Sequence, residues 1–302
     1  MGTTPMMLKI TTKFEPFKRK LKYHRNMRKL SRIKIRTIED TLERIKNGAS
    51  VCRFGDGEIY LMLSSDRNSG FQKGSTELTD TLLEVFATQE KNLLICLPDA
   101  YMKGEIKKYK RFAKTYWKNH ITDQSNLTFI RQDRVYYNSN ITRPYMDYKD
   151  SDYGRHVFDT WKGIFKDKEL LIIEGARTRI GVGNDLLDNA DSVQRILIPP
   201  RDAFDKTDEI INYTVSNVDK KKLVLVAAGP AAKKIVRDLY RAGYQAIDIG
   251  HLDVEYEWFL KRAALKCPIK GKYVNESGGD SKYDFDEAIL SGYKAQIIKC
   301  FC

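Results

Sequence analysis

Residues 244–259, with the sequence YQAIDIGHLDVEYEWF, decide the fold because they join a short apolar run to a dense polar segment. The run 244–249 is apolar enough to form a buried strand. His251 and three carboxylates follow it at once. Acids at a helix start complement the helix dipole, and Asp253 is a suitable cap. Taken alone, the segment therefore predicts a strand followed by a helix and does not establish a site.

A second acidic cluster of the same kind follows the short apolar run 50–52. Its sequence, RFGDGE over residues 53–58, places Asp56 and Glu58 one residue apart. The glycines allow a turn in which the acids are merely solvated. Two acidic strand ends in one chain can also face one crevice, and this coincidence favours a site.

Further apolar runs divide the chain into alternating strands and helices. They occupy residues 93–97, 170–173, 193–198 and 223–228. Stretches with helical periodicity separate most of them. Thr37 begins a capping-box-like helix start, and Gly48 can end that helix. The alternation predicts an α/β fold with a mostly parallel sheet covered by helices on both faces. Ligands of such sheets bind outside the carboxyl ends of the strands.

The composition is that of a globular protein with a substantial core. The chain has 302 residues, of which 42% are hydrophobic. No apolar run approaches the roughly 20 residues that span a bilayer. The N-terminus lacks a signal-peptide pattern, so the expected location is the cytoplasm. Five cysteines without CxxC spacing indicate neither a disulfide framework nor a thiolate zinc site.

Most of the net charge of +13 belongs to the first 36 residues. Residues 1–36 carry 12 Lys or Arg and one acid, a net of +11, whereas residues 37–302 carry 41 basic and 39 acidic residues, a net of +2. The sequence therefore predicts a basic arm over 1–36 and a domain over 37–302. The arm suits an anionic membrane surface and a packed helix with a solvated basic face equally well. Nucleic acid is a weaker candidate because the body of the protein has no basic bias.

Two more strand ends carry groups suited to phosphate. Residues 174–185, EGARTRIGVGND, put arginines and glycines between a strand and a helix, where N–H and guanidinium groups bind anions. Residues 227–232, AAGPAA, let a ligand approach the backbone, although they equally allow a helix to pack tightly on the sheet. The candidate ligand-binding residues at the strand ends are Arg53, Gly55, Arg179, Gly181, Gly183, Asn184, Asp185, Gly229, Pro230 and His251.

The carboxylates of the two acidic clusters suit different roles. Asp56 and Glu58 can hold Mn²⁺ or Mg²⁺, which completes its shell with substrate phosphates. A carboxylate of the other cluster can accept a proton from an acceptor hydroxyl. Glu255 and Glu257 lie about 200° apart around a helix, so only one of them can point into the crevice. We expect Glu255 to be that base, with Glu257 and Asp253 as the other candidates.

Five ordered motifs resemble those of the GT-D-type glycosyltransferases. They are RFGDGE at 53–58, EG at 174–175 with Arg179 and GVGND at 181–185, AAGP at 227–230, DIGHLDVEYEW at 248–258, and KYVNE at 272–276. The resemblance covers residues 37–302 and leaves only the basic arm outside.

The resemblance implies a Rossmann-like GT-D fold, a nucleotide-sugar donor, and a D-x-E motif that holds a divalent metal, usually Mn²⁺, against the diphosphate. That motif is Asp56 and Glu58 in this chain. Members of the family act in bacterial surface glycosylation, including glucosyl transfer from UDP-glucose to glycans of serine-rich adhesins. Similar domains occur in capsule or exopolysaccharide clusters.

The expected function is an inverting, metal-dependent transfer of a hexose from a UDP-sugar to a glycan acceptor on a protein or lipid carrier. Glucose is the leading candidate for the hexose. One alternative is a metal-dependent phosphoesterase, which usually needs a richer His/Asp metal set than a chain with four histidines offers. The other is a non-enzymatic, nucleotide-binding adaptor that associates with a membrane through the arm.

Overall fold

The computed structural model describes residues 5–302, with side chains from residue 17 onward except that of Asp280. A nine-stranded sheet runs through the described residues in the order β1-β4-β3-β2-β8-β7-β5-β6-β11, and all neighbouring strands are parallel. The strands are β1 (Lys34–Ile35), β2 (Ser50–Arg53), β3 (Leu93–Leu97), β4 (Val135–Asn138), β5 (Glu169–Gly175), β6 (Ser192–Ile198), β7 (Leu223–Ala227), β8 (Ala246–Asp248) and β11 (Ile297–Cys300). A separate antiparallel pair joins β9 (Tyr273–Val274) to β10 (Gly279–Asp280).

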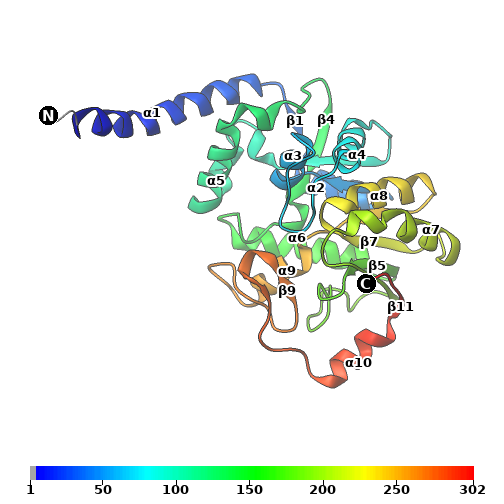
Figure 1. Cartoon of the computed structure of the whole chain (residues 1–302). Helices are drawn as coiled ribbons and strands as arrows, with labels where there is room; N and C mark the ends of the chain where they lie inside the picture. Colours follow the sequence, from blue (N-terminus) through cyan, green and yellow to red (C-terminus); the bar gives the residue numbers. More distant parts are fainter. Residues whose placement is uncertain (1–4) are drawn as a thin grey trace.

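Helices cover both faces of the large sheet (Figure 1). The α-helices are α1 (Pro5–Lys29), α2 (Ile38–Lys46), α3 (Asp56–Met62), α4 (Thr76–Ala87), α5 (Arg111–Thr122), α6 (Ser151–Phe165), α7 (Thr207–Asn217), α8 (Ala232–Arg241), α9 (Leu252–Leu260) and α10 (Glu287–Ala295). Contacts join α4, α7 and α8 into one layer, and α2, α6 and α9 into the other. The connections that contain α4, α7 and α8 run along the sheet in one direction, and those that contain α2, α6 and α9 run in the other. Because crossovers between parallel strands are right-handed, the two groups of helices lie on opposite faces. The structure confirms the predicted α/β class.

The apolar runs form the centre of the sheet, as the sequence predicts. All residues of β3 are buried, as are the inner residues of β5 and β7. Strands covered on both faces need such continuous apolar sequences. The first predicted helix is α2, in which the side chain of Thr37 accepts a hydrogen bond from the Asp40 N–H. The Rossmann-like interpretation of these segments is therefore correct.

Three strands of the sheet were not predicted from the sequence. They are the two edge strands β1 and β11, and β4, which lies beside β1. Each is short, and β4 alternates buried with less buried residues. Only one face of such a strand contributes to the core, so its sequence carries little apolar signal. Cys300 belongs to β11.

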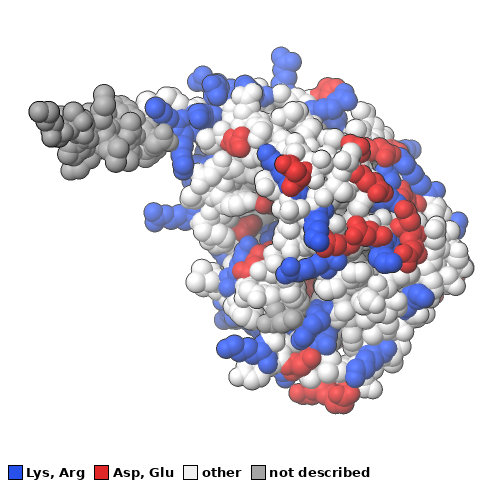
Figure 2. Space-filling model, viewed as in Figure 1, with Lys and Arg blue, Asp and Glu red and all other residues white. Residues whose placement is uncertain are grey.

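The basic arm is partly built into the domain. Its helix α1 projects from the body, where Figure 2 shows Lys and Arg side chains along the described part. At the base of the helix, the Asn26 side chain donates to the backbone oxygens of Ile121 and Thr122, while Met27 is buried. β1 then pairs with β4. The domain thus includes residues 26–36, which the sequence assigned to the arm. No described helix is long and apolar enough to cross a membrane.

Candidate active site

A cavity of about 860 Å³ opens over the carboxyl ends of the sheet strands, where parallel sheets bind ligands. Its wall comes from the segments that follow β2, β5, β6, β7 and β8, from α5, and from residues 139–147 and 273–276. Loop residues 69–72 complete the wall, which also includes residues of the segments after β5 and β7. This loop is fixed by hydrogen bonds, because the Asp202 N–H donates to the Phe71 oxygen (2.8 Å) and the Phe204 N–H donates to the Gln72 side chain (3.0 Å).

A buried lysine organises the acidic cluster after β2. Lys233, on α8, lies 2.6 Å from Glu58 Oε1 and 3.0 Å from Asp248 Oδ2. The other oxygen of Glu58 accepts a hydrogen bond from the Gly55 N–H (2.9 Å). Burial alone would raise the pKa of Glu58, but Lys233 and the Gly55 N–H hold it below the ordinary value. Glu58 is therefore an ionised carboxylate with both oxygens occupied.

Asp56 differs from Glu58 because its carboxylate is exposed at the cavity. Its Oδ2 accepts a hydrogen bond from the Tyr116 hydroxyl, and its Oδ1 has no hydrogen-bond partner among the described residues. Asp56 thus fits a divalent cation that takes one or two protein carboxylates and fills its shell with phosphate oxygens. Glu58 would have to exchange Lys233 for that cation. The described part of the chain holds no ready-made cluster of three or more metal-binding side chains.

Arg53 is held at the bottom of the cavity by close packing against a glycine. Its backbone N–H donates to Asp248 Oδ2 (3.2 Å), and its guanidinium group donates to the Thr142 hydroxyl. Gly250 has a φ of +46°, and a Cβ there would lie 2.6 Å from Arg53 Nη2. Glycine at 250 therefore both permits the turn after β8 and leaves room for the guanidinium group.

A three-residue polar network closes one side of the cavity. Arg143 Nη2 donates to Glu276 Oε1 (2.7 Å) and lies 2.9 Å from His251 Nδ1, while His251 Nε2 lies 3.0 Å from Glu276 Oε2. Burial, followed by the charge of Arg143, lowers the pKa of His251. An arginine can only donate, so Nδ1 is the acceptor and the proton of the neutral ring lies on Nε2. All three side chains line the cavity.

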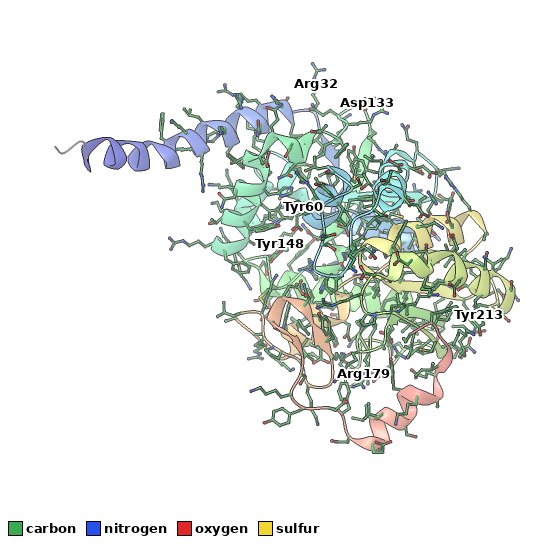
Figure 3. All side chains as sticks on the ribbon, viewed as in Figure 1. Arg32, Tyr60, Asp133, Tyr148, Arg179 and Tyr213 are labelled. Carbon is green, nitrogen blue, oxygen red and sulfur yellow. The ribbon has the colours of Figure 1, made fainter. Side chains whose placement is uncertain are left out.

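The glycine-rich segment after β5 does not present its predicted residues to the cavity. Arg179 donates to the Gly271 oxygen (2.8 Å) and pairs with Asp284. Figure 3 shows Arg179 on the side of the molecule where α10 lies. The Gly181 N–H and the Asn184 side chain donate to Asp253. The cavity wall includes none of the predicted donor-binding residues Arg179, Gly181, Gly183, Asn184 and Asp185.

The segment faces away from the cavity because its polar groups find partners elsewhere in the protein. Asp185 pairs with Lys162 and accepts a hydrogen bond from Tyr256, and a Cβ at Gly183 would lie 2.5 Å from Phe285. Its neighbours Arg177 and Thr178 do line the cavity. The sequence located the segment at the correct strand end but not the direction of its side chains.

The acids of α9 lie behind the cavity wall. Asp253 Oδ2 is 2.6 Å from Lys272 Nζ, and Glu257 Oε1 is 3.3 Å from the same atom. Glu255 faces a different segment, where its Oε2 accepts the N–H groups of Tyr145 (3.2 Å) and Met146 (2.8 Å). None of the three expected catalytic acids lines the cavity. Their catalytic roles remain predictions without support from the geometry of the cavity.

The other predicted residues do meet at the cavity. They are Arg53, Gly55, Asp56, Glu58, Gly229, Pro230 and His251. Sequence reasoning missed Lys233, Arg143 and Asp147, which also line it. Lys233 is one of two adjacent lysines in an amphipathic helix, and the sequence does not show that this one is buried. Arg143 and Asp147 follow β4, in a segment whose tyrosines and prolines indicate a wall but not which side chains face inward.

The model of the family described as "Glycosyltransferase GT-D fold" matches residues 51–277. The chain belongs to the GT-D glycosyltransferase family. It is 36% identical over 269 residues to a "Probable glycosyl transferase Gly" of Streptococcus gordonii, and 33% identical over 273 residues to a "Glycosyltransferase GlyD" of Streptococcus pneumoniae. Each match covers 88% of this chain but only 38% and 33% of the respective relative. The chain therefore spans about a third of the length of these curated relatives.

Solved structures support the same GT-D assignment. One is described as "The highly conserved domain of unknown function 1792 has a distinct glycosyltransferase fold"; it superposes with a TM-score of 0.84 at 36% identity, covering 92% of this chain and 99% of the other. Another, "A New Glycosyltransferase (DUF1792) from Streptococcus sanguinis", gives a TM-score of 0.81 at 35% identity and covers 89% of this chain and all of the other. The chain accordingly has the GT-D glycosyltransferase fold that its sequence predicts.

Proposed function

We propose that this glycosyltransferase moves a hexose from a UDP-sugar to a glycan acceptor in surface glycoprotein or polysaccharide synthesis. Glucose is the leading candidate for the hexose, and the reaction inverts the configuration at the sugar carbon. The observation that carries the proposal is the cavity at the strand ends, where an exposed carboxylate, Asp56, lies among the cations Arg53, Arg177 and Lys233. A diphosphate needs such cations, and a metal bridging it needs such a carboxylate.

The two strand ends beside Lys233 suit the diphosphate. Gly229 has a φ of +54°, and a Cβ there would have only Phe71, at 3.9 Å, within contact range. The backbone at Gly229 is therefore open to a ligand. Lys233 already lies 3.3 Å from the Gly229 oxygen and is neutralised by two carboxylates, so it holds the acids in place as much as it attracts phosphate.

We propose Mn²⁺ or Mg²⁺ as the cofactor, held by Asp56 together with Glu58. When bound, the ion would neutralise charge on the diphosphate leaving group. Asp56 can bind without rearrangement, and Lys233 can stay with Asp248 when Glu58 turns to the cation. The two curated streptococcal relatives are longer than this chain, so the acceptor and its protein or lipid carrier are proposals about the whole protein.

A donor screen tests this function directly. The purified chain is incubated with UDP-, GDP- and dTDP-sugars and Mn²⁺, and release of the free nucleotide is measured. We expect slow hydrolysis of a UDP-hexose, fastest with UDP-glucose, and loss of hydrolysis with a chelator. Hydrolysis of simple phosphate esters at a higher rate than of every nucleotide sugar would favour the phosphoesterase alternative.

Calorimetry of UDP binding tests the metal separately. We expect Mn²⁺ to strengthen UDP binding by at least about tenfold, roughly 1.4 kcal/mol. Asp56→Ala should abolish that gain because its carboxylate is the exposed ligand. Asp66→Ala is the matched control, since Asp66 is an exposed acid outside the cavity wall. Equal UDP affinity with metal and with chelator in the wild type would contradict the metal role.

We also propose that α1 contacts an anionic membrane surface from the cytoplasmic side. Phe17 and Leu21 are exposed one helical turn apart, and Lys18, Lys22 and Arg25 accompany them. Exposed apolar side chains next to cations suit the interface of an anionic bilayer. Deleting residues 1–22 should weaken binding to phosphatidylserine vesicles and leave donor hydrolysis unchanged. Unchanged vesicle binding would refute the contact.

A further inference from the structure

We infer that the α5 end of the cavity binds the acceptor sugar and that Asp147 takes the proton from its attacking hydroxyl. The inference rests on the proposed function, because it presumes that a sugar donor occupies the strand ends. It assigns a second substrate site, and a base that differs from the acids of α9.

An aromatic surface on α5 forms one side of this subsite. Phe112 and Tyr116 lie one helical turn apart, line the cavity, and remain 44% and 48% exposed. Trp117 lines the same wall and stacks edge-on against Tyr116. Exposed aromatic patches mark binding sites, and the C–H faces of sugar rings pack on aromatic rings while the hydroxyls stay in water. Figure 1 shows α5 at the side of the sheet where β4 and β1 lie.

Asp147 is the cavity acid whose carboxylate has no hydrogen bond or ion pair among the residues that the structure describes. Each of the others has a partner: Glu58 and Asp248 share Lys233, Glu276 pairs with Arg143, and Asp56 accepts from Tyr116. Asp147 is half-buried in the wall between Arg143 and α5. Its oxygens are therefore available to a hydroxyl of a ligand.

The backbone around Asp147 is fixed from three sides. The Asp147 oxygen accepts the Lys110 N–H (2.8 Å), and the Tyr148 hydroxyl donates to buried Asp99 (2.9 Å). On α9, the Glu255 carboxylate accepts hydrogen bonds from the N–H groups of Tyr145 and Met146. Glu255 is thus a positioning residue: it holds the segment that carries Asp147 into the cavity. A fixed base is more effective because its hydrogen-bond geometry needs no reorganisation.

The step balances without a further reactant. The acceptor hydroxyl transfers its proton to an Asp147 oxygen, and the acceptor oxygen forms a bond to the first carbon of the donor sugar. The bond from that carbon to the diphosphate breaks, and the nucleoside diphosphate leaves with the electron pair. The charged groups that face this position are Lys110, Arg143 and Glu255, together with Asp56 across the Tyr116 hydroxyl.

The test uses the full chain, the donor found in the screen, and para-nitrophenyl glycosides of common hexoses as acceptors. Transfer is measured by chromatography of the nitrophenyl product. We expect Asp147→Ala to lower kcat for transfer by about 10² or more, as for a lost general base, with UDP affinity within twofold. Sodium formate should restore part of the rate, because a small carboxylate can enter the space left by the side chain.

Glu255→Gln is the conservative variant that separates positioning from proton transfer. Its amide oxygen can still accept both N–H groups but is no base, so transfer should fall far less than in Asp147→Ala. Phe112→Ala should raise KM for the aryl glycoside roughly threefold to tenfold and leave KM for the donor unchanged. Tyr283→Ala, which truncates a 74% exposed tyrosine outside the cavity, should change neither.

Wild-type transfer by Asp147→Ala, or a loss that formate does not restore, would overturn the base. A loss in Glu255→Gln with normal transfer by Asp147→Ala would return the base to α9. If the wild type hydrolyses its donor but neither binds nor glycosylates any aryl glycoside, the acceptor subsite is wrong. Failure of the proposed function is distinct, since the wild type would then release no nucleotide from any donor.

Discussion

The segments after β2 and β5 have similar sequences but opposite roles in the structure. Both follow a buried strand and combine arginine, acids and glycines. After β5, Glu174 is fully buried and pairs with Arg195 (2.6 Å), and residues 179–185 bond to α9 and to the C-terminal segment. After β2, Asp56 remains exposed at the cavity. One segment is closed by partners from the protein, and the other is open to a ligand.

The difference lies in whether each acid has a cation partner. In the closed region, Arg195 pairs with Glu174, and Lys272 lies between Asp253 and Glu257. In the open region, Lys233 neutralises Glu58 and Asp248 but leaves Asp56 free to bind a cation. A motif at a strand end therefore becomes a site only where the fold supplies fewer partners than the motif has charges.

Removing the central cation of the closed region should cause the largest effect. Lys272→Met leaves Asp253 and Glu257 buried without their lysine, and breaking a buried ion pair costs about 3–5 kcal/mol. The free energy of unfolding from urea titration measures the loss. Lys261→Met is the control, because Lys261 is exposed and 3.8 Å from Glu257, and exposed pairs contribute about 0–1 kcal/mol. A Lys272→Met protein that is stable but cannot bind UDP would contradict the distinction between the closed and the open region. Lys272 would then belong to the donor site.

The sequence predicts the central strands and the helix order because these elements carry strong local patterns. It does not predict β1, β4 and β11, since each contributes few buried residues. The sequence also left the arm open between a membrane contact and a packed helix: Met27 and Leu30 are spaced among cations, and only packing against α5 shows that they are buried. Local periodicity identifies elements whose burial is continuous and fails where burial depends on a distant neighbour.

Glu255 offers a sharper test, because it is the acid of α9 that has no cation partner. Burial raises its pKa to about 7, although Arg143 and the Tyr145 and Met146 N–H groups act in the opposite direction. Between the ordinary value of 4.5 and about 7, the folded protein holds a proton that the unfolded chain releases. The free energy of unfolding contributed by this group therefore falls as pH rises through that window, by about 3 kcal/mol in total.

Glu255→Gln removes this titration, so the difference in unfolding free energy between wild type and variant isolates it. Urea titrations should show that the unfolding free energy of the variant, relative to that of the wild type, is higher at pH 8 than at pH 5. A difference that does not change with pH would mean that Glu255 is ionised throughout this range.

The candidate site was predictable only in part. Asp56, Glu58, Gly229 and His251 could be placed because glycines and acids at strand ends form a compact pattern. Lys233 could not, because its burial depends on two carboxylates from other elements, Glu58 of α3 and Asp248 of β8. The directions of Arg179 and Asn184 were also beyond local reasoning, since their partners lie 69 or more residues away along the chain.

The smallest expected effect distinguishes backbone strain from a role at the open region. Gly250 and Gly48 both have positive φ, but a Cβ at Gly250 would meet the Arg53 guanidinium, whereas a Cβ at Gly48 would meet nothing within 4 Å. Both alanine variants should lose about 1 kcal/mol of unfolding free energy from the left-handed backbone. Only Gly250→Ala should also weaken UDP binding, by about threefold, because Arg53 must shift within the proposed donor site. Calorimetry on both variants measures this difference. Equal UDP affinity in Gly250→Ala and Gly48→Ala would show that Arg53 supports the fold after β2 and does not contact the donor.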